Sequence, residues 1–267
     1  MKKIILVISV MLVSCSLYED SEQPDIYFQI DDFDIFKLGK AISDMLMGPN
    51  NNYIYLCDYN NNSLVKVGIQ GSMQLVSELV LGSHPIAMDI SPDQSHIAVA
   101  MEGESSVYLV SLENFSIVSS FAVSLMNMND IVYASDHRLL ISSTTDPTVI
   151  AYDLNTQTET SQSILNGELV VNLNDSTAYV ASASSVKKYN VSNDQASLVP
   201  YVADPFGFSA GINHFIISPD KNTLLLCLTN PEDHRNVKSV YSYDAETLTF
   251  AGKYKVDSPG MGIAVSN

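Results

Sequence analysis

Hydrophobic and polar positions alternate in short blocks along this chain, and a polar turn recurs between the blocks. The clearest turns are Ser91-Pro92-Asp93 and Ser218-Pro219-Asp220, and weaker copies lie at 48–51, 134–137 and 173–176. Proline presets the backbone of a turn, and aspartate can fold its side chain back onto the backbone. Successive turns are about 40 to 45 residues apart, a period typical of repeats that contain four strands each.

Each turn is followed by a short apolar segment, which predicts a strand buried on both faces. These segments are 53–57, 96–100, 139–142, 178–181 and 224–227. A third strand follows in the same register, at 64–67, 107–110, 149–152, 186–189 and 240–243. A fourth strand is expected at 75–81, 117–123 and 248–256. Four short strands per repeat, with no helical period beyond the N-terminus, predict an all-β architecture.

The second repeat carries the features of a known family. Residues 85–93 (Pro-Ile-Ala-Met-Asp-Ile-Ser-Pro-Asp), with the strands at 96–100 and 107–110, resemble one YVTN-type β-propeller repeat. The resemblance covers most of residues 45–267, and it implies a β-propeller of four-stranded blades without any family-wide catalytic residue. Gln94 and Lys221 stand where the family usually has glycine, so this chain is a divergent member.

The number of blades depends on the two ends of the chain. Five complete repeats occupy residues 45–257, and short apolar segments remain at 26–30, 35–38 and 262–266. A propeller must close its ring or leave exposed sheet edges. We therefore expect six blades, the last shared by both termini; the alternative is an incomplete seven-bladed propeller.

The first fifteen residues predict a lipoprotein signal peptide. Residues 1–14 begin with two lysines, continue with an apolar run and end before Cys15 in the sequence Leu-Val-Ser-Cys, which resembles the bacterial lipobox. Cleavage before Cys15 and lipidation of its thiol would anchor the chain stably in a membrane. Residues 15–25 then form the lipidated cysteine with an acidic tether, and 26–267 the propeller domain. We expect an exported protein anchored to the bacterial cell envelope, at the outer membrane or cell surface.

Charge and composition narrow the possible partners. The chain has 30 acidic and 13 basic residues, for a formal net charge of −17. Phosphate backbones repel such a chain, so we expect no nucleic-acid partner, and a self-repelling surface favours a monomer. Cys57 and Cys227 end the second strands of different repeats, too far apart for a disulfide, so we expect them to be unpaired.

No catalytic constellation is readable in the sequence. The histidines have no metal-ligand spacing, and both a Gly-x-Ser-x-Gly motif and a Gly-rich phosphate loop are absent. We therefore assign no catalytic residue, no metal and no cofactor. Tryptophan is also absent, which weakens a carbohydrate-stacking platform.

Propeller geometry places the loops between second and third strands, and the loops between blades, on one face. Asp58, Glu102 and Asp130 are among the polar residues expected there, whereas His96 belongs to the opposite turns and is expected to face solvent or to be structural. Converging polar groups on a concave face are the default binding site. The candidate ligand contacts are His84, His214, Asp233 and His234.

The sequence as a whole favours a binding or interaction scaffold for a protein or cell-surface ligand. The alternatives are a propeller-type hydrolase or lactonase and a purely structural envelope protein. Side chains lining the channel would discriminate between them: three or more carboxylates or amides within reach of one metal would favour the enzyme.

Overall fold

The computed structural model describes residues 16–17, 38–163, 168–172, 177–182, 185–190, 195–197, 211–218, 220–229 and 239–255. The chain divides into two compact units, the larger formed by 36–180 with 187–197 and the smaller by 1–35, 181–186 and 198–267. The signal peptide, Cys15, the strands expected at 26–30 and 262–266, and the strand expected at 35–38 apart from Leu38 lie outside the described residues. In the described part of the chain, no helix is long and apolar enough to cross a membrane.

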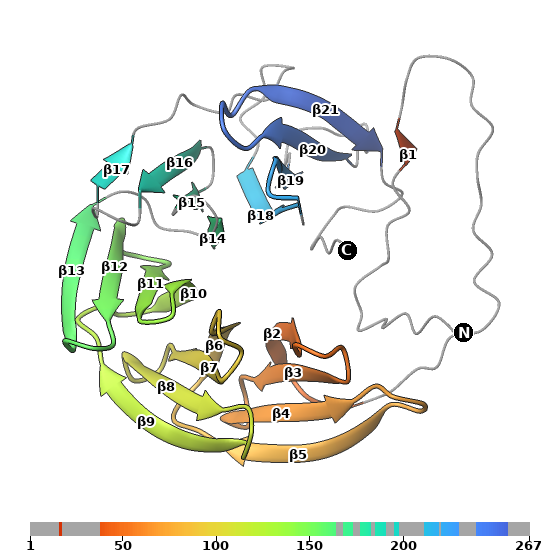
Figure 1. Cartoon of the computed structure of the whole chain (residues 1–267), viewed down its shortest axis with the longest axis vertical. Helices are drawn as coiled ribbons and strands as arrows, with labels where there is room; N and C mark the ends of the chain where they lie inside the picture. The colour runs from red at the N-terminus through yellow and green to blue at the C-terminus, as the bar shows by residue number, and fades with distance from the viewer. Residues whose placement is uncertain are drawn as a thin grey trace. The chain divides into compact units, whose positions relative to one another are not determined.

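Four-stranded antiparallel sheets follow one another along the chain (Figure 1). The first sheet contains β2 (Ile42–Met47), β3 (Tyr53–Asp58), β4 (Ser63–Gly68) and β5 (Gln74–Val80). The second contains β6 (Pro85–Ile90), β7 (His96–Met101), β8 (Ser106–Ser111) and β9 (Ser116–Ala122). The third contains β10 (Met128–Ser135), β11 (Arg138–Ser143), β12 (Thr148–Asp153) and β13 (Thr158–Ser163). The fourth contains β14 (Glu168–Asn172), β15 (Thr177–Ser182), β16 (Ser185–Asn190) and β17 (Gln195–Ser197).

The fifth sheet belongs to the smaller unit and has one additional strand. It contains β18 (Gly211–Ile217), β19 (Thr223–Thr229), β20 (Ser239–Asp244) and β21 (Phe250–Lys255). A short β1 (Ser16–Leu17) pairs antiparallel with β21, with Ser16 opposite Lys255 and Leu17 opposite Tyr254. The two residues that follow Cys15 therefore extend the edge of this sheet.

The repeat register read from the sequence is confirmed in all five sheets. Each predicted second strand lies within β3, β7, β11, β15 or β19, and each predicted third strand within β4, β8, β12, β16 or β20. The second strands are buried along almost their whole length, as in β7, where the residues from Ile97 to Met101 are all fully buried. Near-continuous apolar runs are the pattern expected of such doubly covered strands.

The Ser-Pro-Asp turns owe their shape to the serine and aspartate side chains. The Ser91 hydroxyl donates to Asp93 Oδ1 at 2.6 Å and accepts from the backbone N–H of His96 at 3.0 Å. In the fifth sheet, the Ser218 hydroxyl likewise donates to Asp220 and accepts from the Thr223 N–H. Each serine thereby ties the start of its turn to the strand that follows.

The same turns have one position whose backbone would suit glycine. Gln94 has φ of 60° and Lys221 has φ of 64°, both in the left-handed region. Side chains with a Cβ disfavour this region by about 1–2 kcal/mol, whereas glycine adopts it readily. Asn51 occupies the corresponding position of the first sheet with φ of 52°, so the backbone shape persists where the glycine is missing.

A continuous apolar core joins the first three sheets. Its members come from facing strands of neighbouring sheets, and the ring of Phe121 in the second sheet stacks on Tyr152 in the third at a centroid distance of 4.0 Å. Ile97 and Leu139 are fully buried in this core. Truncating such a residue to alanine typically costs about 2–5 kcal/mol.

Three aspartates on the first strands connect neighbouring sheets of the larger unit. We call Asp44, Asp89 and Asp130 the first-strand carboxylates. Each accepts a hydrogen bond from a backbone N–H of the next sheet's first strand, at 2.7 Å, from Met88, Tyr133 and Leu169 respectively. Asp130 was expected in a loop, but it lies within β10 because its carboxylate has this backbone partner.

Cys57 and Cys227 are both buried, and they are not joined in a disulfide, as predicted. Cys57 pairs with Asp44 across β2 and β3, and Cys227 pairs with His214 across β18 and β19. A register shift lies beside each pairing, between Ile42 and Asp44 and between Ile212 and His214. The two cysteines therefore occupy equivalent positions in different sheets.

Candidate functional site

The first and second sheets present two rims, because alternate connections of an antiparallel sheet lie at opposite ends. The loop rim consists of the connections at 59–62, 81–84 and 102–105. The turn rim consists of the turns at 48–52, 91–95 and 112–115. Polar side chains gather on both rims, but their partners differ.

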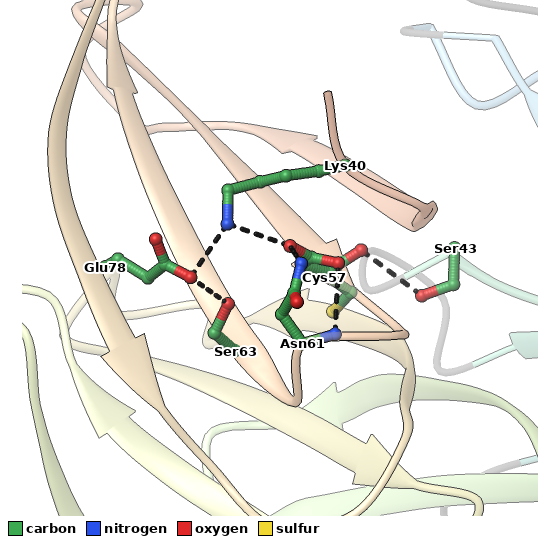
Figure 2. A network of polar contacts seen from close by, with 7 residues as sticks. Lys40, Ser43, Cys57, Asn61, Ser63 and Glu78 are labelled. Atoms are coloured by element: carbon green, nitrogen blue, oxygen red, sulfur yellow. Dashed lines mark hydrogen bonds and ion pairs between the residues drawn. The ribbon is translucent and has the colours of Figure 1, made fainter. Parts of the chain in front are cut away.

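The loop rim begins with a network centred on Lys40, which lies just before β2 (Figure 2). The Lys40 ammonium donates to Asp58 Oδ2 and to Glu78 Oε1, both at 2.8 Å. Asn61 also donates to Asp58, and the Ser63 hydroxyl donates to Glu78, each at 2.7 Å. We call these five residues the Lys40 latch, since they join the chain before β2 to β3, β4 and β5.

The charges of the Lys40 latch compensate one another. Burial by itself would raise the pKa of Asp58, whose side chain is inaccessible to solvent, but hydrogen bonds from Lys40 and Asn61 outweigh burial and lower it. Hydrogen bonds from Lys40 and Ser63 lower the pKa of Glu78. Burial alone would lower the pKa of Lys40, and its two carboxylate partners raise it instead. All three groups are therefore charged at neutral pH and committed to one another.

His84 lies on the loop rim, beside residues of the first and second sheets. Its ring stacks on Tyr59 at a centroid distance of 4.5 Å, and its backbone N–H donates to Asn62 Oδ1 at 2.9 Å. The Tyr59 hydroxyl donates to Glu102 at 2.7 Å, and this hydrogen bond raises the tyrosine pKa. His84 has φ of 57°, but the corresponding Asn127 has φ of 48°, so the left-handed backbone belongs to the repeat.

For the other three candidate contacts predicted from the sequence, the structure describes no side-chain surroundings. His214 lies in β18 of the smaller unit, opposite Cys227. Asp233 and His234 lie outside the described residues. His84 is thus the one candidate contact whose side-chain surroundings are described, and the group of four stays a prediction.

The turn rim contains a groove between the first and second sheets, with a volume of about 410 Å³. Volumes of this order are typical of small-molecule sites. Its lining combines aromatic, aliphatic, charged and amide or hydroxyl side chains, namely Gly48, Pro49, Asn50, Tyr53, Tyr55, Lys66, Gln94, Ser95, His96, Ser111, Leu112 and Glu113. A Cβ on Gly48 would lie 3.0 Å from the Tyr55 ring, so glycine allows this turn to approach the aromatic wall.

Lys66 is the cation of the groove, and aromatic rings hold it in place. Its ammonium lies 4.1 Å from the centroid of Tyr53, 5.6 Å from Phe115 and 5.8 Å from Tyr55. Such cation–π contacts are worth about 0.5–1 kcal/mol at exposed sites and more when desolvated. The side chain is half-buried. None of the ion pairs of the described residues includes Lys66.

His96 is oriented by its neighbours in the turn. The Ser95 hydroxyl lies 2.5 Å from His96 Nδ1 and within 2.8 Å of both carboxylate oxygens of Asp93. Since a carboxylate only accepts, the serine hydrogen goes to Asp93, and His96 Nδ1–H donates to the serine oxygen. Hydrogen bonds from Ser91 and Ser95 lower the pKa of Asp93 to about 2. This arrangement fixes the orientation of the His96 ring in the lining of the groove.

These residues do not form a hydrolytic triad. In a triad the histidine lies between the serine and the carboxylate, whereas here Ser95 lies between Asp93 and His96. Among the residues that the structure describes, no three His, Cys, Asp or Glu side chains gather at metal-binding distance. The groove is chemically equipped to hold a ligand through charge, hydrogen bonds and ring contacts.

Sequence reasoning did not find this groove. Its residues come from two repeats, and the lining spans 48–113. One signal was present: Lys66 interrupts the apolar strand Leu64-Val65-Lys66-Val67, and two tyrosines occupy alternate positions of the preceding strand. His96, expected to be solvent-facing or structural, is half-buried and lines the groove.

Comparison with solved structures identifies the fold. The chain is similar to Kuenenia stuttgartiensis hydrazine synthase (TM-score 0.63, 13% identity, covering 77% of this chain and 63% of that one). It is also similar to the structure of U3-55K (0.64, 11%, 80% and 64%) and to the RRP9 WD40 repeats (0.63, 11%, 80% and 63%). The chain spans less than two thirds of each of these structures. No family model and no curated protein matches the sequence.

These similarities, together with the successive four-stranded sheets, show that the chain has an all-β, WD40-like β-propeller fold. Each of the five sheets is one blade of that fold. At identities of 11 to 13% the similarity concerns the fold alone.

Proposed function

We propose that this chain is a lipid-anchored, extracytoplasmic β-propeller of the YVTN-repeat type that acts as a binding scaffold. The observation that carries the binding role is the groove on the turn rim, where a half-buried lysine and an oriented histidine line a space of about 410 Å³. Concave sites with a few placed polar groups on a rigid scaffold are typical of ligand binding.

The anchor part of the proposal comes from the sequence around Cys15. The lipobox-like Leu-Val-Ser-Cys ends a short apolar run that follows two lysines. Ser16 and Leu17 pair with β21, which would hold the lipidated residue beside the edge of the fifth sheet. Mass spectrometry of the protein from its native host should find an acylated N-terminal Cys15. An intact Met1, or cleavage that leaves Cys15 unmodified, would contradict the anchor.

The binding role is tested by blocking the groove in the full chain, purified in detergent. Asn50 is exposed and lines the groove, so Asn50→Trp should fill part of the space without disturbing the core. Asn155→Trp is the matched control, because Asn155 is an exposed asparagine in the turn between β12 and β13. Partners captured from host envelope extract should be lost with Asn50→Trp and retained with Asn155→Trp.

The contacts predicted from the sequence at Asp233 and His234 form the competing site. Replacing the 230–237 loop by a short Gly103-Glu104-Ser105 type tests the contacts predicted at Asp233 and His234. If that exchange removes the captured partners and Asn50→Trp does not, the ligand binds through the 230–237 loop and the groove has no role.

A further inference from the structure

We propose that the groove on the turn rim binds an acidic saccharide, with the sugar carboxylate on Lys66. This inference rests on the proposed binding function and adds the chemical class of the ligand. Three features of the groove support this inference: its charge, the hydrogen-bonding groups of its lining, and the turns that contribute to that lining.

The charge of the groove favours an anion. Lys66 is the one lysine or arginine in the lining, and it takes part in none of the ion pairs of the described residues. By contrast, Lys40 on the loop rim has two carboxylate partners at 2.8 Å. In a chain with 30 acidic and 13 basic residues, a half-buried lysine without a carboxylate is a distinct positive centre. A ligand carboxylate would accept a charge-assisted hydrogen bond from the Lys66 ammonium.

Glu113 is the one acidic side chain of the lining, and it is exposed. Solvent screens an exposed carboxylate, so its repulsion of an anion is small. Lys66 is held against three aromatic rings instead, where removal from solvent strengthens its charge interactions. Lys66 is therefore the one positive centre of the lining, beside the exposed carboxylates of Glu113 and of Asp93, which accepts a hydrogen bond from Ser95.

The remaining polar groups suit hydroxyls. Asn50, Gln94 and Ser111 supply amide and hydroxyl groups that both donate and accept. His96 Nδ1 is hydrogen-bonded to the Ser95 hydroxyl, so Nε2 is the ring nitrogen left to interact with a ligand hydroxyl. The partly exposed Tyr53 ring offers a surface for the apolar face of a sugar.

The form of the groove favours a compact ligand over an extended peptide. Its lining combines the turns at 48–50, 94–95 and 112–113 with side chains of β3, β4, β7 and β8. A peptide that binds a sheet usually adds a strand to an open edge through backbone hydrogen bonds. The groove is lined mainly by turns and side chains, so it fits a ring with several hydroxyls better.

The test is a ligand-observed NMR titration of the full chain in detergent with D-glucuronate, D-glucose and a tetra-aspartate peptide. Glucuronate should bind, and glucose should bind at least about tenfold more weakly, because one charge-assisted hydrogen bond is worth more than a tenfold change in Kd. Glucuronate affinity should also fall with rising salt. Equal affinity for the two sugars, or no binding of glucuronate, would overturn the proposal.

Three variants locate the interaction. Lys66→Gln should weaken glucuronate binding at least about tenfold and leave glucose unchanged. Lys188→Gln is the matched control, because Lys188 also lies over a tyrosine, 5.9 Å from the Tyr179 centroid, outside the groove. Glu113→Gln should strengthen glucuronate binding by about twofold, because it removes a negative charge from the lining; weaker binding would contradict an electrostatic attraction between the groove and the sugar carboxylate.

The outcomes separate this inference from the proposed function. If tetra-aspartate binds more tightly than glucuronate and needs Lys66, the groove takes an acidic peptide and the saccharide class is wrong. If none of the three probes binds while Asn50→Trp still removes partners from envelope extract, the scaffold function stands and the ligand class fails. If Asn50→Trp also has no effect, the groove itself is not the site.

Discussion

The two rims of the first and second sheets contain similar residues and use them differently. On the loop rim, Lys40 is surrounded by Asp58 and Glu78, and Tyr59 is bonded to Glu102. On the turn rim, the Lys66 ammonium instead lies over the rings of three aromatic residues. Polar groups whose partners are supplied by the protein stabilise the fold, whereas groups held in place without such partners are positioned for a ligand. The comparison separates a lysine that stabilises the fold from the lysine proposed to bind a ligand.

The largest expected effect comes from breaking the Lys40 latch. Lys40→Met should lower the free energy of unfolding by about 3–5 kcal/mol, because it leaves the buried Asp58 carboxylate without its counterion. The double variant Lys40→Met/Asp58→Asn should recover part of this loss. Urea denaturation measures both, and glucuronate binding should not change. A loss below about 1 kcal/mol would show that water replaces the lysine.

Acid should weaken the Lys40 latch, whereas the first-strand carboxylate Asp89 should respond in the opposite direction. The Asp58 pKa is lowered, so the stability it contributes is present above its ordinary pKa of 3.8 and is lost as pH falls through the folded value. Burial raises the Asp89 pKa to about 7, and hydrogen bonds from Tyr133 and Ile90 only partly oppose this. The folded chain then holds a proton that the unfolded chain releases, so stability falls between about pH 4 and 7.

The measurement for Asp89 is the free energy of unfolding in urea at several pH values from 4.5 to 7.5. We expect a decline of up to about 1.4 kcal/mol per pH unit, steepest between about pH 5 and 6. Asp89→Asn should flatten the decline, and Lys66→Gln should not. A wild-type stability that rises over this interval would contradict the raised pKa.

On the turn rim, removing the Ser91 hydroxyl should cost less stability but should disturb the groove. Ser91 is buried, donates to Asp93 and accepts from the His96 N–H. Ser91→Ala should lower stability by about 1–2 kcal/mol and weaken glucuronate binding by freeing the His96 turn. Ser218→Ala makes the same change in the fifth sheet and should leave binding intact. Equal binding losses in both variants would indicate a global effect.

The smallest expected effect is stabilising. Gln94 has a left-handed backbone, so Gln94→Gly should relieve up to about 1 kcal/mol of strain, partly offset by the flexibility of glycine in the unfolded chain. Lys221→Gly should behave alike, because Lys221 has the same φ region. Thermal unfolding of the two variants measures the gain. Destabilisation in both would show that the side chains, rather than the backbone, determine these turns.

The sequence predicted the fold well because its signals are local. A turn residue and the apolar run after it lie within ten residues, so Ser91-Pro92-Asp93 and 96–100 sufficed to place β7. The groove could not be predicted in the same way, since it depends on which side chains of two repeats meet across the sheets. The contacts of Lys66 with Tyr53, Tyr55 and Phe115 depend on how the chain folds in three dimensions, so the sequence alone did not reveal them.

The first-strand carboxylates illustrate a signal that was present but not used. Asp44, Asp89 and Asp130 recur near the start of successive repeats, and a polar residue that recurs in an otherwise apolar strand indicates a bond to a neighbouring repeat. Asp130 was instead read as a loop residue. Its partner, the Leu169 N–H, lies in the next sheet, beyond the reach of a single-repeat alignment.

These carboxylates also determine how the groove would respond mechanically. Asp44 bonds to Met88 and Ser43 to Pro85, both at 2.7 Å, so two hydrogen bonds resist shear of the first sheet against the second. Neighbouring sheets that cannot slide keep the walls of the groove at a fixed separation. A ligand would then enter a site that needs little reorganisation, and affinity differences among ligands would appear mainly in their dissociation rates.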